Sequence, residues 1–323
     1  MKNKLISIVA PMYNEEEVLG IFFSRIREVF DTVKRFDYEI ICINDGSEDN
    51  TLKELKKFSN QDNRIKVINL SKNCGKEIAL TAGLDHVHGD ATIPMDCDLQ
   101  DPPEVIVSML EKWEEGYQVV LAKRADRSSD SFIKRTTSST FYKLIDLISD
   151  IHIPENVGDF RLLDRSALNA IQEYRENSRF MKGLFASIGF REATIEYSRE
   201  PRAAGTTKWN YFKLYKLALE GIISFTSFPL LIWSYLGAIV AFSAFSYGIF
   251  LIARTLIYGI DSPGYASIMV VLLFMSGLIL LCLGVIGEYL SRIFIEIKGR
   301  PLYHTNGLFG FDKQEQKNGT PSE

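Results

Sequence analysis

The chain shows two patterns of hydrophobic and polar positions, and one replaces the other near residue 210. Before this point, short β-rich runs alternate with longer stretches in which apolar residues recur at helical spacing. The predicted strands are LISIVAP (5–11), YEIICIND (38–45), IKVINLS (65–71), ATIPMD (91–96) and YQVVLAK (117–123). Alternation of strands and helices predicts an α/β domain built on a mostly parallel sheet, with helices on both faces.

The helical spacing is clearest in residues 15–34. Five apolar residues of this stretch fall on one side of a helix: Val18, Phe22, Ile26, Val29 and Val33. Because an apolar stripe on a helix must be buried, we expect this face to pack against the sheet.

After residue 210 the apolar positions become continuous. No charged residue occurs in 221–253 or in 262–287, and each run exceeds the roughly 20 apolar residues that span a bilayer. A buried helical hairpin of a soluble protein would show polar stripes at helical spacing, and neither run shows them. The pattern therefore predicts two transmembrane helices, at about 230–253 and 266–287.

The segment before the first span, WNYFKLYKLALEGI (209–222), mixes aromatic residues with lysines. This mixture is typical of a helix that lies among lipid headgroups, although an ordinary amphipathic packing helix is the alternative. The prediction divides the chain into four parts: a cytosolic α/β domain (1–208), an interfacial amphipathic segment (209–228), two transmembrane helices (229–290) and a cytosolic C-terminal tail (291–323).

Charge predicts the orientation and argues against one class of partner. Basic residues gather before the first span and after the second, whereas the stretch between the spans holds Arg254 as its only basic residue. The positive-inside rule then places both termini in the cytoplasm, as in a multi-pass protein of the inner membrane. The net charge of −4, from 37 basic and 41 acidic residues, argues against a nucleic-acid binder.

Polar residues follow each of the first four predicted strands. The four exits are PMYNEEE (11–17), NDGSEDNT (44–51), SKNCGKE (71–77) and MDCDLQD (95–101). Each exit taken alone is also explained by turn chemistry, since Asn, Asp, Gly and Ser dominate turns. Because the carboxyl ends of parallel strands share the edge at which ligands bind, four such exits predict a single binding site.

The fourth exit concentrates negative charge. Residues 93–104 carry four carboxylates: Asp96, Asp98, Asp101 and Glu104. Like charges this close need a positive partner. On an extended chain Asp96, Asp98 and Gln100 would face the same way, and a hard divalent cation such as Mg²⁺ or Mn²⁺ takes oxygen ligands. We therefore expect a bound metal that neutralises a diphosphate leaving group.

These motifs together resemble a known family. PMYNEEE, NDGSEDNT and DCDLQDPPE, with GDFRLLDR (158–165) and GTTKW (205–209), make the soluble half similar to a family 2 glycosyltransferase of the GT-A fold. With its two C-terminal spans, the whole resembles the polyprenyl-phosphate glycosyltransferases, closest to the bactoprenol glucosyltransferases of the GtrB type and related to dolichol-phosphate mannose synthase. The resemblance covers about residues 4–300. One departure is Asn44, where many relatives have aspartate, although Asp45 remains.

The resemblance implies roles for individual residues. The donor nucleotide sugar would be held by a set of strand-end residues: Pro11, Tyr13, Asn14, Glu15, Asp45, Lys76 and Asp96. Asp96 would contact the sugar or the metal, and Asp98 and Gln100 would ligate the metal. The acceptor phosphate would bind basic residues that follow the fifth strand or precede the membrane: Arg124, Arg127, Arg135 and Lys208. Arginine suits bidentate recognition of phosphate, and a solvated basic surface is the alternative for each.

Asp159, in GDFRLLDR, matches the aspartate proposed as the catalytic base in this family. A polyprenyl monophosphate has its second pKa near ~6, so at neutral pH it is already a nucleophile. Asp159 would then orient the acceptor or the sugar hydroxyls instead. A structural role, in which Asp159 caps or pairs with Arg161, is the third alternative.

The resemblance thus implies a membrane enzyme that transfers a hexose, with inversion, from a nucleotide sugar to undecaprenyl phosphate at the cytoplasmic leaflet. The resemblance favours UDP-glucose as donor and Mg²⁺ or Mn²⁺ as cofactor. Two alternatives are another sugar (mannose, N-acetylglucosamine or aminoarabinose) and a membrane-tethered nucleotide-sugar binder without turnover. A processive polysaccharide synthase would need more spans and a QxxRW motif, which this sequence lacks. A homo-oligomer and a flippase partner are left open.

Overall fold

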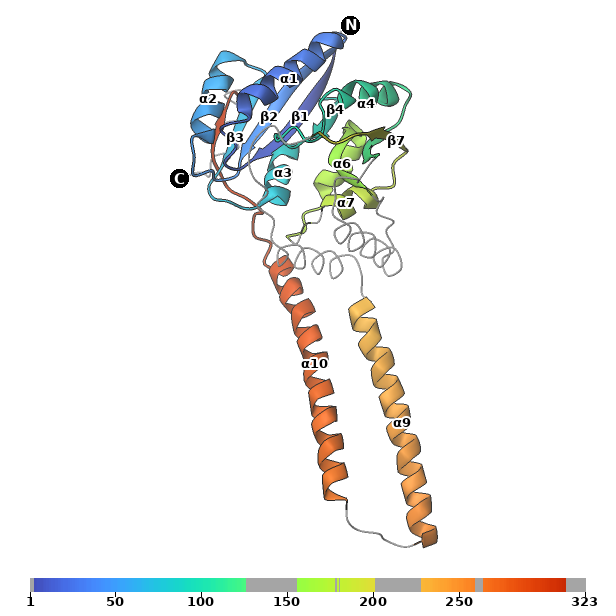
Figure 1. Cartoon of the computed structure of the whole chain (residues 1–323). Helices are drawn as coiled ribbons and strands as arrows, with labels where there is room; N and C mark the ends of the chain where they lie inside the picture. The colour runs from blue at the N-terminus through green and yellow to red at the C-terminus, as the bar shows by residue number, and fades with distance from the viewer. Residues whose placement is uncertain are drawn as a thin grey trace.

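The computed structural model describes residues 3–125, 156–177, 179, 181–200, 228–258 and 264–311. Figure 1 shows two parts, a layered sheet domain and two long helices that lead away from it. The last described residues belong again to the sheet domain, because they form one of its strands.

In the described part of the chain, one eight-stranded sheet forms the centre of the domain. Its strands are β1 (Lys4–Met12), β2 (Phe36–Asn44), β3 (Ile65–Leu70), β4 (Ala91–Pro94), β5 (Val119–Arg124), β6 (Val157–Asp164), β7 (Glu192–Tyr197) and β8 (Thr305–Phe309). They lie in the order β7-β5-β6-β4-β1-β2-β3-β8. The pairs β1–β2, β2–β3, β1–β4 and β5–β7 are parallel, whereas β6 and β8 run antiparallel to their neighbours. The five predicted strands and the predicted α/β domain with a mostly parallel sheet are confirmed.

Helices cover both faces of the sheet (Figure 1). They are α1 (Leu19–Thr32), α2 (Thr51–Gln61), α3 (Lys76–Leu84), α4 (Val105–Glu114), α6 (Arg165–Glu173) and α7 (Met181–Ser187). The β-rich runs form central strands because successive side chains are buried on opposite faces: Ile8 packs in one core cluster and Val9 in the other. The predicted inward face is confirmed, since the five residues of the predicted stripe, which lie within α1 or directly beside its ends, are at most 4% exposed.

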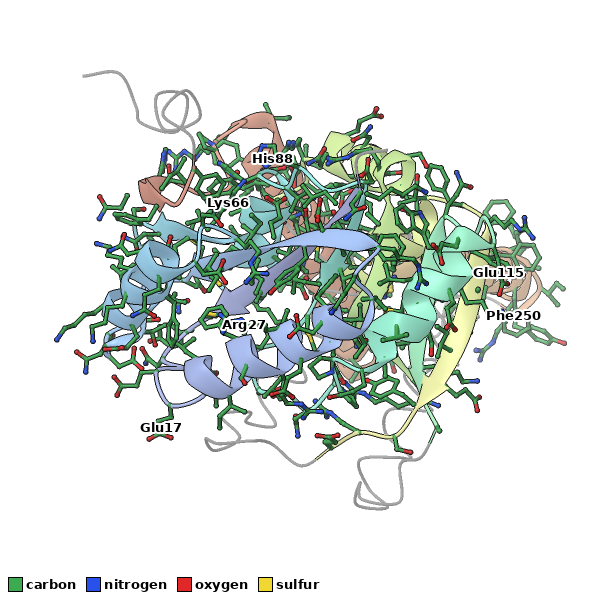
Figure 2. All side chains as sticks on the ribbon, turned by 90° about the horizontal axis from the view of Figure 1, so that it is seen from above. Glu17, Arg27, Lys66, His88, Glu115 and Phe250 are labelled. Carbon is green, nitrogen blue, oxygen red and sulfur yellow. The ribbon has the colours of Figure 1, made fainter. Side chains whose placement is uncertain are left out.

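The amino-terminal side of the sheet holds a buried charged network. Glu39 on β2 is almost completely buried, and its two carboxylate oxygens accept hydrogen bonds from the Ser7 hydroxyl (2.5 Å), the His88 backbone N–H (2.8 Å) and the Lys66 ammonium (2.9 Å). Lys66 and His88 lie side by side in Figure 2, with Lys66 Nζ 3.4 Å from His88 Nδ1. Burial alone would raise the pKa of Glu39, but these partners together lower it.

The two long helices are α9 (Phe228–Tyr258) and α10 (Tyr265–Ile297). Among the described residues, one stretch is long and apolar enough to cross a bilayer, Val270–Ile297 in α10. The apolar stretch of α9, Tyr235–Phe250, is shorter. With 33 residues, α10 is about 50 Å long. The predicted interfacial segment 209–228 lies outside the described residues except for Phe228.

The chain after α10 returns to the sheet. Residues 298–311, which we call the C-terminal strap, contain β8, which forms one edge of the sheet and pairs antiparallel with β3. Thr305 stands opposite Leu70, and Phe309 stands opposite Val67. The strap therefore enters from the carboxyl end of β3, a strand pairing that the sequence analysis did not predict. The end of the predicted tail, 313–323, lies outside the described residues.

Candidate active site

The exits of β1, β2 and β3 are joined at one edge of the sheet. Asp45, directly after β2, donates its backbone N–H to the Met12 carbonyl at the end of β1 (2.9 Å). Its carboxylate accepts the backbone N–H groups of Cys74 (2.7 Å) and Gly75 (2.9 Å) in the loop after β3. Gly46, at φ +65°, lies so close to this loop that a Cβ would stand 2.5 Å from the Asn73 nitrogen. Only glycine fits there, which explains the Asp-Gly pair.

The first exit is bonded to the second in the same way. Asn14 adopts a positive φ of 55°, its backbone N–H donates to the Ser47 hydroxyl (3.0 Å), and its side-chain oxygen accepts the Glu48 N–H (2.8 Å). The Glu15 backbone N–H donates to the Thr51 hydroxyl (2.8 Å). Pro11 lies within β1, and Tyr13 is the first residue after that strand. The predicted donor-binding residues of these two exits are thus brought together by the fold.

Lys76 occupies the centre of the predicted site. It is the first residue of α3, and its ammonium lies 2.8 Å from Asp96 Oδ1 and 2.7 Å from Asp159 Oδ2. Asp96 follows β4, whereas Asp159 lies on β6, so three separate elements supply the cluster. The structure brings together the predicted residues Lys76, Asp96 and Asp159.

Asp159 is held in its ionised form. Burial alone would raise the pKa of this carboxyl, but the positive charges of Lys76 and Lys182 and the hydrogen bond from Lys76 hold it well below its usual range. The carboxylates of Asp159 and Asp96 in turn raise the pKa of Lys76 above its ordinary value, against the effect of burial. Asp159 Oδ1 is buried and has no hydrogen-bond partner among the described residues. Such an atom is rare in a folded protein and suggests a group that acts on a ligand.

The alternative in which Asp159 pairs with Arg161 is not what the structure shows. Arg161 donates from Nη2 to the Gly158 carbonyl (2.7 Å), and its guanidinium lies 4.1 Å from the centre of the Phe185 ring. The ion pair of Asp159 is with Lys76 instead. Burial lowers the pKa of Arg161 to about 10, although the charge of Asp159 opposes this shift.

The segment after β4 turns, and the prediction that it is extended is wrong. β4 ends at Pro94, Leu99 has a φ of +57°, and Asp98 Oδ1 accepts the Gln100 backbone N–H (3.1 Å). An aspartate that bonds the backbone two residues ahead stabilises a turn. The common direction of the side chains of Asp96, Asp98 and Gln100 therefore does not follow from strand alternation.

The protein itself offsets most of the negative charge in this segment. Asp96 pairs with Lys76. Asp101 lies 3.8 Å from Arg124 and 3.9 Å from Arg199, and it accepts a close hydrogen bond from the Tyr197 hydroxyl. The Glu104 carboxylate lies 2.6 Å from Arg25 Nη2. The charge balance alone therefore does not require a metal, and the metal prediction rests on the chemistry of the oxygen ligands.

A metal would find few protein ligands here. Among the described residues, no three His, Cys, Asp or Glu side chains gather into a metal-binding group. Asp98, which is 9% exposed, and Gln100 supply a carboxylate and an amide oxygen from one turn. This donor set fits Mg²⁺ or a similar hard cation, which is usually held by one or two carboxylates together with substrate phosphates.

Arg124, the one predicted acceptor-binding residue that the structure describes, lies at the end of β5. Its Nε donates to the Tyr197 hydroxyl (3.3 Å), which in turn donates to Asp101. The sequence analysis assigned no role to Asp101 or Tyr197. The alternating run EATIEY (192–197) could have indicated a strand ending at that tyrosine. Three predicted residues lie outside the described part of the chain: Arg127, Arg135 and Lys208.

Glu77 is a second, half-buried carboxyl that the sequence analysis missed. It follows Lys76 in the first turn of α3 and accepts the Met181 backbone N–H (3.2 Å). Burial and the nearby negative charge of Asp159 raise the pKa of Glu77 to about 7. No pattern in the sequence distinguishes this glutamate from its exposed neighbours in other helices.

Comparison with known proteins identifies the family. The model of glycosyl transferase family 2 matches residues 7–172, which include Asp45, Lys76, Asp96 and Asp159. An uncharacterized glycosyltransferase of Synechocystis sp. is 51% identical over 307 residues, which cover 95% of this chain and 96% of that protein. The chain belongs to glycosyltransferase family 2.

Further similarities of this glycosyltransferase extend beyond the matched domain. The bactoprenol glucosyl transferase of Shigella phage SfII is 47% identical over 298 residues, 92% of this chain and 96% of that protein. Among solved structures, the mannosyl-3-phosphoglycerate synthase from Rubrobacter xylanophilus aligns with a TM-score of 0.46 and 17% identity, covering 67% of this chain and 71% of that one.

Proposed function

We propose that this glycosyltransferase transfers glucose from UDP-glucose to undecaprenyl phosphate at the cytoplasmic face of the membrane, with inversion at the anomeric carbon. The relatives named bactoprenol glucosyl transferase support the sugar and the lipid acceptor. The observation that carries the proposal is that the sheet edge with the Lys76 cluster lies within a short chain length of the end of the long apolar helix α10.

The C-terminal strap shows how close this edge of the sheet lies to the end of α10. His304 comes seven residues after Ile297, the last residue of α10, and its carbonyl accepts the Ser71 backbone N–H at the end of β3 (2.9 Å). Seven residues span at most about 25 Å. The carboxyl ends of the strands therefore lie within reach of the end of α10, where a lipid phosphate would be presented.

We propose that α9 and α10 both span the membrane and that both termini are cytoplasmic. The chain runs away from the sheet domain along α9 and back to it along α10, and it then forms β8 in the sheet (Figure 1). This path supports an even number of crossings. α10 exceeds the ~30 Å hydrocarbon core by several turns. Its final turns hold the Glu288–Arg292 ion pair (3.2 Å), which suits the headgroup region.

In the donor complex, the residues of the first two exits and Lys76 hold the nucleotide sugar, as the family resemblance implies. Asp98 and Gln100 would hold a divalent metal, whose charge stabilises the departing diphosphate. Lys76 fixes the positions of Asp96 and Asp159 relative to each other before the donor arrives. We assign Asp96 to the sugar or the metal.

We assign Asp159 to orientation rather than to proton removal. A general base works best when its pKa lies near the working pH, and the pKa of Asp159 is held far below it. The acceptor phosphate needs no base, because it is a dianion above about pH 7. Arg124, with Arg127, Arg135 and Lys208, is proposed to hold that phosphate.

The test is a transfer assay with the purified full chain in detergent, undecaprenyl phosphate, and a panel of UDP- and GDP-sugars. We expect a sugar–lipid product with UDP-glucose, its loss in EDTA, and its recovery with Mg²⁺ or Mn²⁺. Asp98→Asn should abolish transfer while the fold persists, because it removes a charged metal ligand. Full activity in EDTA would refute the metal, and nucleotide-sugar binding without product would favour the tethered binder.

A further inference from the structure

The C-terminal strap contacts both ends of one active-site unit. This unit, residues 71–85, comprises the loop after β3, the helix α3 and the residue that follows it, Asp85. It carries Lys76 and the two backbone N–H groups that Asp45 binds. Its position therefore determines where the Lys76 ammonium lies between Asp96 and Asp159.

The strap binds the start of the unit through the backbone. β8 pairs with β3 up to Leu70, and the next hydrogen bond runs from the Ser71 N–H to the His304 carbonyl (2.9 Å). The loop turns away from the sheet directly after this bond. On its other side the loop is held by Asp45 and by the close approach of Gly46.

The strap binds the end of the unit through a side chain. The Tyr303 hydroxyl donates to Asp85 Oδ2 (2.8 Å), and Arg175 reaches the same oxygen (2.8 Å). Asp85 directly follows α3. Adjacent residues of the strap, Tyr303 and His304, thus contact the two ends of the unit.

The strap is anchored at its far end, and the last turn of α10, just before the strap, is anchored as well. Phe311 is 6% exposed, and Gly310, at φ +77°, lies so close to the domain that a Cβ would stand 2.6 Å from the Ser59 hydroxyl oxygen and 2.7 Å from the Ile65 carbonyl oxygen. At the helix end, the Glu296 carboxylate accepts the Asn177 backbone N–H (2.8 Å) and side-chain amide (3.0 Å).

We propose that the strap is a positioning element of the donor site, which sets the 71–85 unit and thereby the Lys76 ammonium. The proposal deepens the proposed function and rests on it where donor binding is concerned. Because the strap continues from α10, the donor site is completed by chain that lies beyond the matched family domain.

The test uses the full chain in detergent and a matched pair of glycine variants. Gly310→Ala introduces a Cβ into the closest contact of the strap, whereas Gly299→Ala places one in open space, and both glycines have positive φ. Three quantities are measured: hydrogen exchange of residues 71–85, the Kd of UDP with Mn²⁺, and the unfolding midpoint. Ile26→Val, a core change on the other face of the sheet, controls for general destabilisation.

We expect faster exchange across 71–85 in Gly310→Ala and a Kd raised roughly fivefold or more, the range of ordinary coupling between sites. Gly299→Ala and Ile26→Val should leave both quantities unchanged. If Gly310→Ala does not fold, Tyr303→Phe should increase exchange at the Asp85 end of the unit. A strap released in Gly310→Ala, as judged by proteolysis, with unchanged exchange and Kd would overturn the proposal, as would equal effects of the two glycine variants.

The exchange measurement separates this proposal from the proposed function, because it needs no substrate. If the chain transfers no sugar, exchange in 71–85 still decides whether the strap positions the unit. Transfer by Gly310→Ala with a normal donor KM would leave the proposed function intact and reject the strap's role.

Discussion

Two carboxylates on the same sheet, the buried Glu39 and the half-buried Asp159, differ in how completely they are satisfied. Glu39, on the amino-terminal side, uses both oxygens, which accept bonds from Ser7, His88 and Lys66. Asp159, at the opposite side, gives one oxygen to Lys76 and buries the other without a partner among the described residues. The pKa of each is lowered by its partners against the effect of burial.

The difference separates a carboxylate that holds the fold from one that serves a ligand. Leaving a buried acceptor unsatisfied costs about 1 to 3 kcal/mol. Glu39 avoids that cost. Asp159 does not, because its one ionic partner, Lys76, is shared with Asp96 and bonds only one of its two oxygens. The free oxygen of Asp159 becomes satisfied only when a substrate hydroxyl or another donor arrives, which is the behaviour of a site residue.

The sharpest test of this comparison is Asp159→Asn. We expect kcat to fall by roughly 10²-fold, the cost of misplacing a reacting group, the KM for the lipid to rise, and the unfolding midpoint to stay near that of the wild type. Since Asp159 is ionised throughout and the phosphate is a dianion above ~7, the loss should be the same from about pH 7 to 9. A loss relieved as the pH rises would instead indicate a general base, and unchanged kcat/KM would return Asp159 to a structural role.

Glu39→Gln should give the opposite result. Removing one member of a buried ion pair costs about 3 kcal/mol of unfolding free energy, while kcat/KM of the surviving protein should not change. Because the folded pKa of Glu39 lies below its unfolded value, its stabilisation is complete at neutral pH and disappears as the pH falls through the folded pKa. The gap between variant and wild type, measured by denaturant titration in detergent, should therefore narrow in acid. Asp37→Asn, at an exposed position on the same strand, is the control. A loss of activity in Glu39→Gln that Asp37→Asn does not show would contradict a purely structural role for Glu39.

Tyr197→Phe should have the smallest effect of the three variants, because Tyr197 contacts Arg124 and not the Lys76 cluster. It removes the hydroxyl between Arg124 and Asp101 and keeps the ring. Loss of one such bond, worth about 1 kcal/mol, should raise the acceptor KM roughly fivefold with little change in kcat. Tyr117→Phe, before the start of β5, serves as control. A larger effect on the UDP-glucose KM than on the lipid KM would assign Arg124 to the donor instead.

The sheet and its strand exits could be predicted because they are local patterns. Runs such as YEIICIND are β-branched and flanked by turn residues, and the rule for parallel sheets then places Asp45, Lys76 and Asp96 at one edge. The inward face of α1 followed from helical spacing alone. These features depend on neighbouring residues in the sequence.

The remaining features depend on contacts between distant residues. For Asp159 the sequence offered Arg161, two residues away, as one possible partner, whereas the ion pair is with Lys76 on another element. The turn at Leu99 broke the expected alternation of Asp96 and Asp98, because a short strand that ends at Pro94 leaves the motif free to turn. β8 has an ordinary composition, and its pairing with β3 follows from the return of the chain after α10.

The position of β8 at the end of the chain also has a consequence for biosynthesis. β3 is complete once residue 70 has been made, but its neighbour on the outer side, residues 305–309, leaves the ribosome only after both long helices. An unpaired edge strand invites pairing with other chains. During translation the catalytic domain is therefore an unfinished sheet, and its last strand is added only after the hydrophobic segments have been delivered, so folding of the domain ends after membrane insertion begins.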